Sequence, residues 1–204
     1  MWQLDHSNGA RWQNERLLAA AWREAAPFPH LVIDGFVPAD RLDALMVALD
    51  EEHIARYEGD LFAFEASAPE PASRELAELR TEFARVMSPP LSRITDKPVT
   101  RVDMRAYAYR PGHYLLPHSD HQDGLARVLA YAYYLPSPEP PVGGELELFR
   151  VELVDGAAAV TESACTIEAR ANRLVVFDVS EVSLHQVREV LSGLRISLAG
   201  WFYA

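Results

Sequence analysis

The sequence predicts a single α+β domain over residues 1–204, with helices packed outside a β-sheet sandwich or barrel. Its 204 residues, 49% of them hydrophobic, are enough to bury one full core. Apolar residues recur at helical spacing through most of residues 1–98, and the period changes to two over residues 99–204. Helices followed by a long run of strands are typical of α+β folds.

Residues 1–98 are expected to form a mainly helical support. Prolines separate its elements, because proline lacks the backbone N–H that a helix interior requires. The expected elements are a helix over 8–26, a strand over 30–34, a helix that begins at Pro38 and a helix over 73–87. We expect Ser73 to be the N-cap of the last helix, and Pro89 and Pro90 to end it.

Residues 99–204 are expected to form the sheet and to carry the catalytic core. Apolar and polar side chains alternate there, as in strands that bury one face. The expected strands cover residues 102–109, 128–135, 145–149, 160–167, 174–177, 182–190 and 195–203. The run from Pro136 to Pro141 is expected to be a stiff loop, since its prolines cannot donate to a central strand.

Composition and charge exclude several classes of partner. The net charge of −11 would repel nucleic-acid phosphates, so no nucleic-acid partner is expected. No apolar run approaches the roughly 18 residues that cross a bilayer, so no membrane partner is expected either. Cys165 is the single cysteine, and residues 1–5 lack the features of a secretion signal. We therefore expect a cytoplasmic protein, while its oligomeric state stays open.

Two histidines and one aspartate have the order of an iron site. His118-Ser119-Asp120 follows a strand-like run, and His185 lies in a second such run. If residues 118–120 form a strand, alternation places His118 and Asp120 on the same face. Two histidines and one carboxylate form the facial triad of non-haem Fe(II) oxygenases. We expect His118, Asp120 and His185 to be the metal ligands and the catalytic centre; three separate structural polar residues are the alternative.

The second half of the chain also resembles a known family. Its motifs are similar to those of the Fe(II)/2-oxoglutarate dioxygenases of the prolyl 4-hydroxylase type. These motifs are Tyr109 to Asp120, Tyr134-Leu135 with Gly143 to Leu146, and Leu174 to Phe177 ahead of His185. Residues 183–190 and 195–202 are similar to the branch of the ribosomal prolyl hydroxylases. The resemblance covers residues 101–204 and implies a distorted double-stranded β-helix, or jelly roll.

The resemblance further implies a hydroxylase that uses Fe(II), 2-oxoglutarate and O₂, with ascorbate as a candidate reductant. Such an oxidoreductase hydroxylates an unactivated C–H bond and decarboxylates 2-oxoglutarate to succinate. The distal carboxylate of 2-oxoglutarate needs a buried, fork-shaped cation, which Arg195 supplies better than a lysine could. Ser197 shares a strand face with Arg195, and Tyr109 matches the family's tyrosine that bonds the same carboxylate. We expect these three residues to bind 2-oxoglutarate.

The substrate stays open. We favour an amino-acid-like small molecule or a peptide over a prolyl residue of a ribosomal-type protein, because the eukaryotic ribosomal enzymes carry a second β-helix domain that 204 residues cannot hold. A non-catalytic, cupin-like metal-binding or sensing module is the alternative of another class. Arg127, Arg173 and Arg188 are equal candidates to bind a substrate carboxylate. His113 and His121 are expected to lie outside the ligand set, in a turn and at the surface or behind the ligands respectively.

Overall fold

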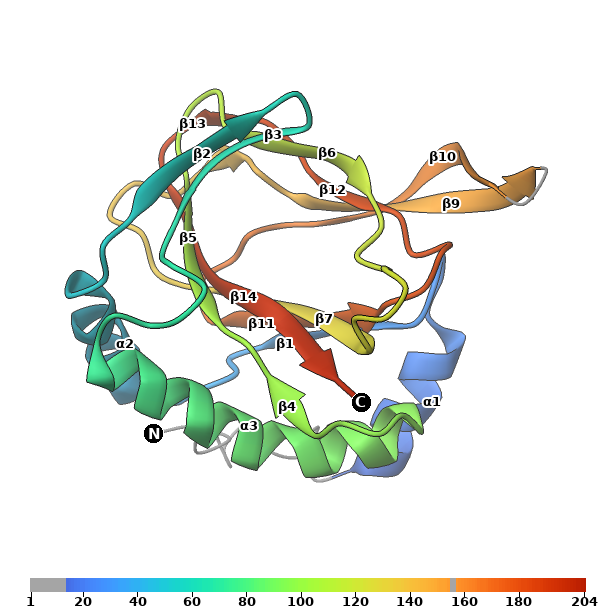
Figure 1. Cartoon of the computed structure of the whole chain (residues 1–204), viewed down its shortest axis with the longest axis horizontal. Helices are drawn as coiled ribbons and strands as arrows, with labels where there is room; N and C mark the ends of the chain where they lie inside the picture. The colour runs from blue at the N-terminus through green and yellow to red at the C-terminus, as the bar shows by residue number, and fades with distance from the viewer. Residues whose placement is uncertain (1–13, 155–156) are drawn as a thin grey trace.

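The computed structural model describes residues 14–154 and 157–204 and shows a curled antiparallel sheet with helices against one side (Figure 1). The helices are α1 (Glu15–Glu24), α2 (Ala39–Asp50) and α3 (Arg74–Thr95). The strands are β1 (His30–Asp34), β2 (Ala55–Gly59), β3 (Phe62–Ala66), β4 (Arg101–Val102), β5 (Arg105–Tyr109), β6 (Tyr114–His118), β7 (Arg127–Tyr134), β8 (Val142–Gly143), β9 (Leu146–Val154), β10 (Ala157–Ile167), β11 (Arg173–Asp178), β12 (His185–Val187), β13 (Val190–Ser192) and β14 (Arg195–Tyr203).

The main sheet bends into two layers that face each other (Figure 1). Its strand order is β1-β11-β7-β14-β5-β3-β6-β12-β9-β10, and the neighbouring strands run antiparallel. Strands β1, β11, β7, β14 and β5 make the layer next to the helices, called the helix-side layer below, and the other five strands of this order make the opposite layer. This arrangement confirms the predicted α+β fold with a jelly-roll core.

Side chains of the helix-side layer alternate between two cores. On β7, Tyr131 and Tyr133 pack toward the helices, where the Phe83 ring of α3 lies 5.0 Å from the Tyr131 ring. Ala132 and Tyr134 of the same strand face the space between the two layers. This second core does not fill that space, and a cavity of about 320 Å³ lies next to it. The period-two pattern of the sequence therefore positions both the core and the site.

Helix α3 continues beyond its predicted end. The prediction ended this helix at residue 87, but α3 runs through Pro89 and Pro90 to Thr95. Its apolar stripe also continues, because Leu91 and Ile94 are fully buried. Burying two such side chains stabilises the fold by about 3–6 kcal/mol, comparable to the cost of roughly 3 kcal/mol for each of the two prolines in the helix interior. Tertiary burial therefore overrides the local signal to stop.

Residues 1–98 contribute more to the sheet than the sequence predicts. The hairpin of β2 and β3 was not expected, and β3 joins the two layers by pairing with both β5 and β6. The expected strands over 102–109 and 182–190 are each interrupted, giving β4 with β5 and β12 with β13. Asp103 causes the first interruption, because its carboxylate accepts the backbone N–H of Trp201 at 2.6 Å.

The described residues test two further expectations only in part. The helix expected over 8–26 is observed as α1, and residues 8–13 lie outside the described residues. Among the helices of the described residues, none combines the length and the apolar character that a membrane span requires.

Candidate metal centre

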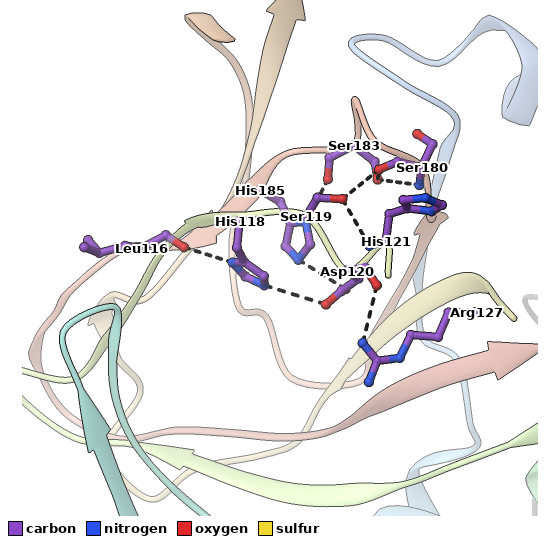
Figure 2. A network of polar contacts seen from close by, with 9 residues as sticks. All are labelled: Leu116, His118, Ser119, Asp120, His121, Arg127, Ser180, Ser183 and His185. Carbon is purple, nitrogen blue, oxygen red and sulfur yellow. Dashed lines mark hydrogen bonds and ion pairs between the residues drawn. The ribbon is translucent and has the colours of Figure 1, made fainter. Parts of the chain in front are cut away.

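The three predicted ligands lie together at one end of the cavity. His118 ends β6 and His185 begins β12, and the two residues are direct partners across this antiparallel pair. Their ring centroids are therefore only 4.3 Å apart. The Asp120 carboxylate faces the Nε2 atoms of both rings, with its oxygens 3.7 Å from His118 Nε2 and 3.5 Å from His185 Nε2 (Figure 2). All three potential ligand atoms lie within 4.8 Å of one another.

The reason that the sequence suggested for this proximity is wrong. Strand β6 ends at His118, so strand alternation does not place Asp120 beside it. A loop instead brings Asp120 next to His185, at the start of β12. The Ser119 hydroxyl holds the start of this loop, since it donates to the Ser180 carbonyl at 2.7 Å and accepts the His121 N–H at 3.1 Å (Figure 2).

Both imidazoles are oriented by backbone carbonyls. His118 Nδ1 lies 2.9 Å from the Leu116 carbonyl, and His185 Nδ1 lies 3.0 Å from the Ser183 carbonyl. Because a carbonyl oxygen only accepts, each Nδ1 must carry the proton, which leaves the lone pair of each Nε2 pointing toward Asp120. Burial lowers the pKa of His185 to about 4, although the Asp120 charge opposes that shift. His185 is therefore neutral at physiological pH, as a metal ligand must be.

The donor set fits a divalent first-row metal ion. Two ligands that bind at about 2.1 Å and at right angles lie roughly 3 Å apart, so the observed separations need to close only slightly. Asp120 and His185 are buried, which keeps competing water away from them. Two neutral imidazoles and one carboxylate are the ligands of the Fe(II) facial triad.

Arg195 lies in the same cavity and has no acidic partner. Its side chain is 4% exposed, and the cavity side of β14 also carries Ser197, whose Oγ lies 3.4 Å from Arg195 Nη1. The guanidinium lies 4.7 Å from the Tyr109 ring, directly across the strand pair. Within the described residues its Nε has no hydrogen-bond partner and no carboxylate pairs with it. A buried cation in this state fits an anionic ligand.

Tyr134 is a candidate ligand-binding residue that the sequence reasoning missed. Its ring lies 4.9 Å from the Arg195 guanidinium, and its buried hydroxyl has no hydrogen-bond partner among the described residues. In the sequence it is one of several neighbouring tyrosines that packing alone could explain. The available signal is its register, because Tyr134 pairs with Ser197. Burial raises the pKa of Tyr109, so its hydroxyl is a neutral donor at physiological pH.

The structure separates the three candidate substrate arginines. Arg127 lies beside the metal centre, with Nη1 3.3 Å from the Asp120 carbonyl and its guanidinium stacked 3.6 Å above the ring of Trp201 (Figure 2). Arg173 instead forms a bidentate salt bridge with Asp34. Arg188 is exposed and lies 4.0 Å from Glu147. Of these three arginines, only Arg127 lies beside the metal centre.

The two remaining histidines of this region lie outside the ligand set. His113 is buried in the turn between β5 and β6, where the sequence placed it. His121 is exposed and lies 3.6 Å from Asp123.

Aromatic side chains form the wall of the cavity that the unexpected β2–β3 hairpin contributes. Phe62 and Phe64 both line the cavity. The Phe64 ring lies 5.4 Å from Tyr107 and 5.7 Å from Tyr109, and this ring cluster continues to Tyr57. The sequence reasoning could not find this wall, because it placed no strands at these positions.

Comparison with known proteins is consistent with this geometry. The model of the 2OG-Fe(II) oxygenase superfamily matches residues 104–203. Prolyl 3-hydroxylase OGFOD1 of Mus musculus is 33% identical over 185 residues, which cover 87% of this chain and 33% of the mouse protein. The chain therefore spans about a third of the length of this relative.

Solved structures share the fold. A prolyl-4-hydroxylase of Pseudomonas putida has a TM-score of 0.65 at 23% identity, with 91% of this chain and 98% of that chain covered. A prolyl hydroxylase of Trichoplax adhaerens, in complex with a peptide fragment of hypoxia inducible factor, has a TM-score of 0.66 at 16% identity, with 95% and 92% covered. At these identities the likeness supports the jelly-roll fold.

Proposed function

This chain belongs to the 2OG-Fe(II) oxygenase superfamily through residues 104–203, and from that premise we propose that it is an Fe(II)- and 2-oxoglutarate-dependent dioxygenase that hydroxylates an unactivated C–H bond. One observation carries the proposal. A two-histidine, one-aspartate centre lines the same cavity as a buried arginine that has no acidic partner among the described residues. A cupin-like sensing module has no use for that arginine, so the catalytic alternative is favoured.

His118, Asp120 and His185 would hold the metal in this proposal. Fe(II), when bound with 2-oxoglutarate and O₂, supplies the oxidising power for the C–H bond. The backbone carbonyls behind the histidines keep both Nε2 lone pairs aimed at the ion before it arrives. Three protein ligands leave the other coordination positions for the cosubstrates.

Arg195 would bind the distal carboxylate of 2-oxoglutarate. A guanidinium pairs with a carboxylate through two parallel N–H donors, which fixes the orientation of the ligand. Tyr109, Tyr134 and Ser197 surround the guanidinium and offer hydroxyl donors. Because Tyr134 and the Arg195 Nε have no partner in the described structure, a bound carboxylate would satisfy polar atoms that are otherwise buried without hydrogen bonds.

The aromatic lining of the cavity supports a prolyl residue as the substrate. Trp201 and Phe64 line this cavity, and Arg127 stacks on Trp201. Flat aromatic faces suit the apolar five-membered ring of a proline side chain. If the proline belongs to a peptide, the residues on either side of it would remain outside the cavity. The cavity, at about 320 Å³, admits little more than the cosubstrate and one residue. That small volume keeps an amino-acid-like small molecule as the second candidate, which the sequence favoured.

The metal assignment is tested with alanine variants at four positions. We expect His118→Ala, Asp120→Ala and His185→Ala to lose Mn(II) binding, measured by calorimetry, and to lose conversion of 2-oxoglutarate to succinate. His121→Ala is the matched control, because His121 adjoins Asp120 but faces solvent. Wild-type turnover in His118→Ala, or loss of metal in a folded His121→Ala, would overturn the assignment.

The substrate is tested by offering both classes to the enzyme. Protein and metabolite extracts are incubated with Fe(II) and 2-oxoglutarate, and mass spectrometry searches each for a gain of roughly 16 Da, one oxygen atom. We expect a hydroxylated prolyl residue in a protein or peptide. A modified metabolite with no modified protein would favour the small-molecule alternative.

Two further expectations stay predictions. We propose that the helical support and the catalytic core fold as one domain, because β1 and β3 hydrogen-bond into the same sheet as the strands of residues 99–204. We also keep the cytoplasmic location as a prediction, supported by the single cysteine Cys165. Fractionation of cells that express the protein tests the location.

A further inference from the structure

The Ser119 side chain joins the two chain segments that carry the metal ligands. Its hydroxyl donates to the Ser180 carbonyl at 2.7 Å, and residue 180 belongs to the connection between β11 and β12. The same hydroxyl accepts the backbone N–H of His121 at 3.1 Å. The Ser119 hydroxyl thus makes two hydrogen bonds, one within the loop that carries Asp120 and one across to the segment that leads to His185 (Figure 2).

The far end of this contact is a tight turn that leads directly to His185. The Ser183 hydroxyl donates to the Ser180 carbonyl at 2.8 Å and accepts the Ser180 N–H at 2.9 Å. The Ser183 N–H also donates to the Ser180 carbonyl, at 3.2 Å. The Ser183 carbonyl then accepts the His185 Nδ1–H. A continuous chain of hydrogen bonds therefore runs from Ser119 to the His185 imidazole.

Asp120 depends on this contact more than the two histidines do. His118 and His185 are fixed by the β6–β12 ladder, whereas Asp120 lies in the loop between β6 and β7, outside any ladder. The hydrogen bond from the His121 N–H to Ser119 Oγ closes a small ring around residue 120. Arg127 adds one longer hydrogen bond, to the Asp120 carbonyl at 3.3 Å. The Ser119 hydroxyl is thus the shortest tether of this loop among the described contacts.

We propose that Ser119 is a positioning residue for the metal centre, which sets the distance between the Asp120 carboxylate and the His185 imidazole. The proposal rests on the metal site of the proposed function. Residues that orient ligands from behind typically change metal affinity about 10–100-fold when they are replaced. The central residue of His118-Ser119-Asp120 would otherwise be free to vary, because its side chain points away from the metal.

The test compares Ser119→Ala with two other variants in the metal-free full chain. Ser119→Thr keeps a hydroxyl at the same position. Ser137→Ala is the matched control, because the Ser137 hydroxyl also donates to a carbonyl and accepts an N–H, both of residue 139, but lies in the proline-rich loop. Calorimetry with Mn(II) measures affinity, and the visible spectrum of the Co(II) complex reports ligand geometry.

We expect Ser119→Ala to bind Mn(II) about 10–100-fold more weakly than the wild type and to shift the Co(II) bands. Ser119→Thr should stay within a few-fold of the wild type, and Ser137→Ala should match it. A purely structural role would instead lower the unfolding temperature of metal-free Ser119→Ala and leave the Co(II) bands unchanged.

The outcomes separate this proposal from the proposed function. If wild-type protein binds neither Mn(II) nor Co(II), the metal centre itself is wrong and the role of Ser119 falls with it. If wild type binds and folded Ser119→Ala binds equally well with an unshifted spectrum, only the role of Ser119 is overturned. Should Ser119→Ala fail to fold, Ser119→Cys replaces the hydroxyl with a weakly hydrogen-bonding thiol of similar size, and unchanged metal affinity with unshifted Co(II) bands in that variant would overturn the proposal.

Discussion

Replacing Arg195 with methionine is expected to weaken 2-oxoglutarate binding strongly without destabilising the protein. The expectation comes from comparing two buried arginines. Arg173 is 8% exposed and Arg195 is 4% exposed, so both guanidinium groups have lost most of their water. Arg173 is compensated by Asp34, with N–O distances of 2.6 and 3.0 Å. Arg195 has only the Ser197 hydroxyl at 3.4 Å and two tyrosine rings.

The expected loss of affinity or stability depends on which carboxylate loses its guanidinium partner in each variant. In Arg195→Met the cosubstrate carboxylate would be buried without a cation, which costs about 3–5 kcal/mol, or roughly 10²–10⁴-fold in affinity. The metal-free protein loses a buried charge that has no acidic partner, so its free energy of unfolding should stay level or rise. Arg173→Met removes the closer guanidinium partner of Asp34. Because that carboxylate is 48% exposed and Arg170 still lies 3.8 Å from it, the loss is only about 1–2 kcal/mol.

Two measurements on each variant decide the matter. Calorimetric titration with 2-oxoglutarate in the presence of Mn(II) gives the affinity, and urea denaturation of the metal-free protein gives the stability. We expect Arg195→Met to lose affinity alone and Arg173→Met to lose stability alone. If Arg195→Met binds 2-oxoglutarate within about threefold of the wild type, the carboxylate is bound elsewhere and the reasoning from the unpaired guanidinium fails.

Three further predictions concern the packing and the charges around the site. Gly200→Ala should lower the free energy of unfolding, measured by urea denaturation, by about 2–3 kcal/mol, because a Cβ there would lie 2.6 Å from the Asp103 carbonyl oxygen. Gly59→Ala is the control, since its Cβ would meet only the tip of the Phe62 ring at 3.3 Å. Equal stability of the two variants would contradict this prediction. Burial opposes ionisation of Glu52, but hydrogen bonds from Ser73 and Ala72 outweigh it and lower the pKa of the carboxyl group. Glu52→Gln should therefore have a lower free energy of unfolding than the wild type above pH 4.5, and the difference should narrow as the pH falls below that value. A difference that does not depend on pH would refute this prediction. Addition of a chelator to Mn(II)-loaded protein should lower its unfolding temperature, and no change in a sample shown to hold metal would mean that the ion binds folded and unfolded chain equally.

The features that the sequence predicted are those with a local and repeated signal. Strand β14 has the bounds expected for it, Arg195 to Tyr203, and its side chains alternate between the two sides of the sheet. The same alternation correctly put Ser197 on the face of Arg195. His118 and His185 could be chosen because His118 follows one strand-like run and His185 lies within another. Period and position are readable in one pass along the chain, so these features needed no knowledge of the fold.

The features that the sequence could not predict depend on distant partners. Arg173 could not be separated from Arg127, since its partner Asp34 lies 139 residues away. Tyr134 looked like its neighbouring tyrosines until its hydroxyl was seen to lack a partner beside Arg195. Helix α3 crosses Pro89 and Pro90 only because the sheet buries the residues that follow. In each case the deciding contact is tertiary.

The position of β14 has a consequence for the order in which the protein can be made. This strand lies between β5 and β7, in the middle of the helix-side layer, yet it follows every other strand of the sheet along the chain. Until residues 195–203 leave the ribosome, β5 and β7 each lack a neighbour, and Tyr109 faces no arginine. The helix-side layer therefore closes, and the proposed cosubstrate site forms, only after all the other strands of the sheet have emerged. A nascent chain halted before residue 195 is expected to remain sensitive to protease, and one extended well beyond residue 203 to become resistant.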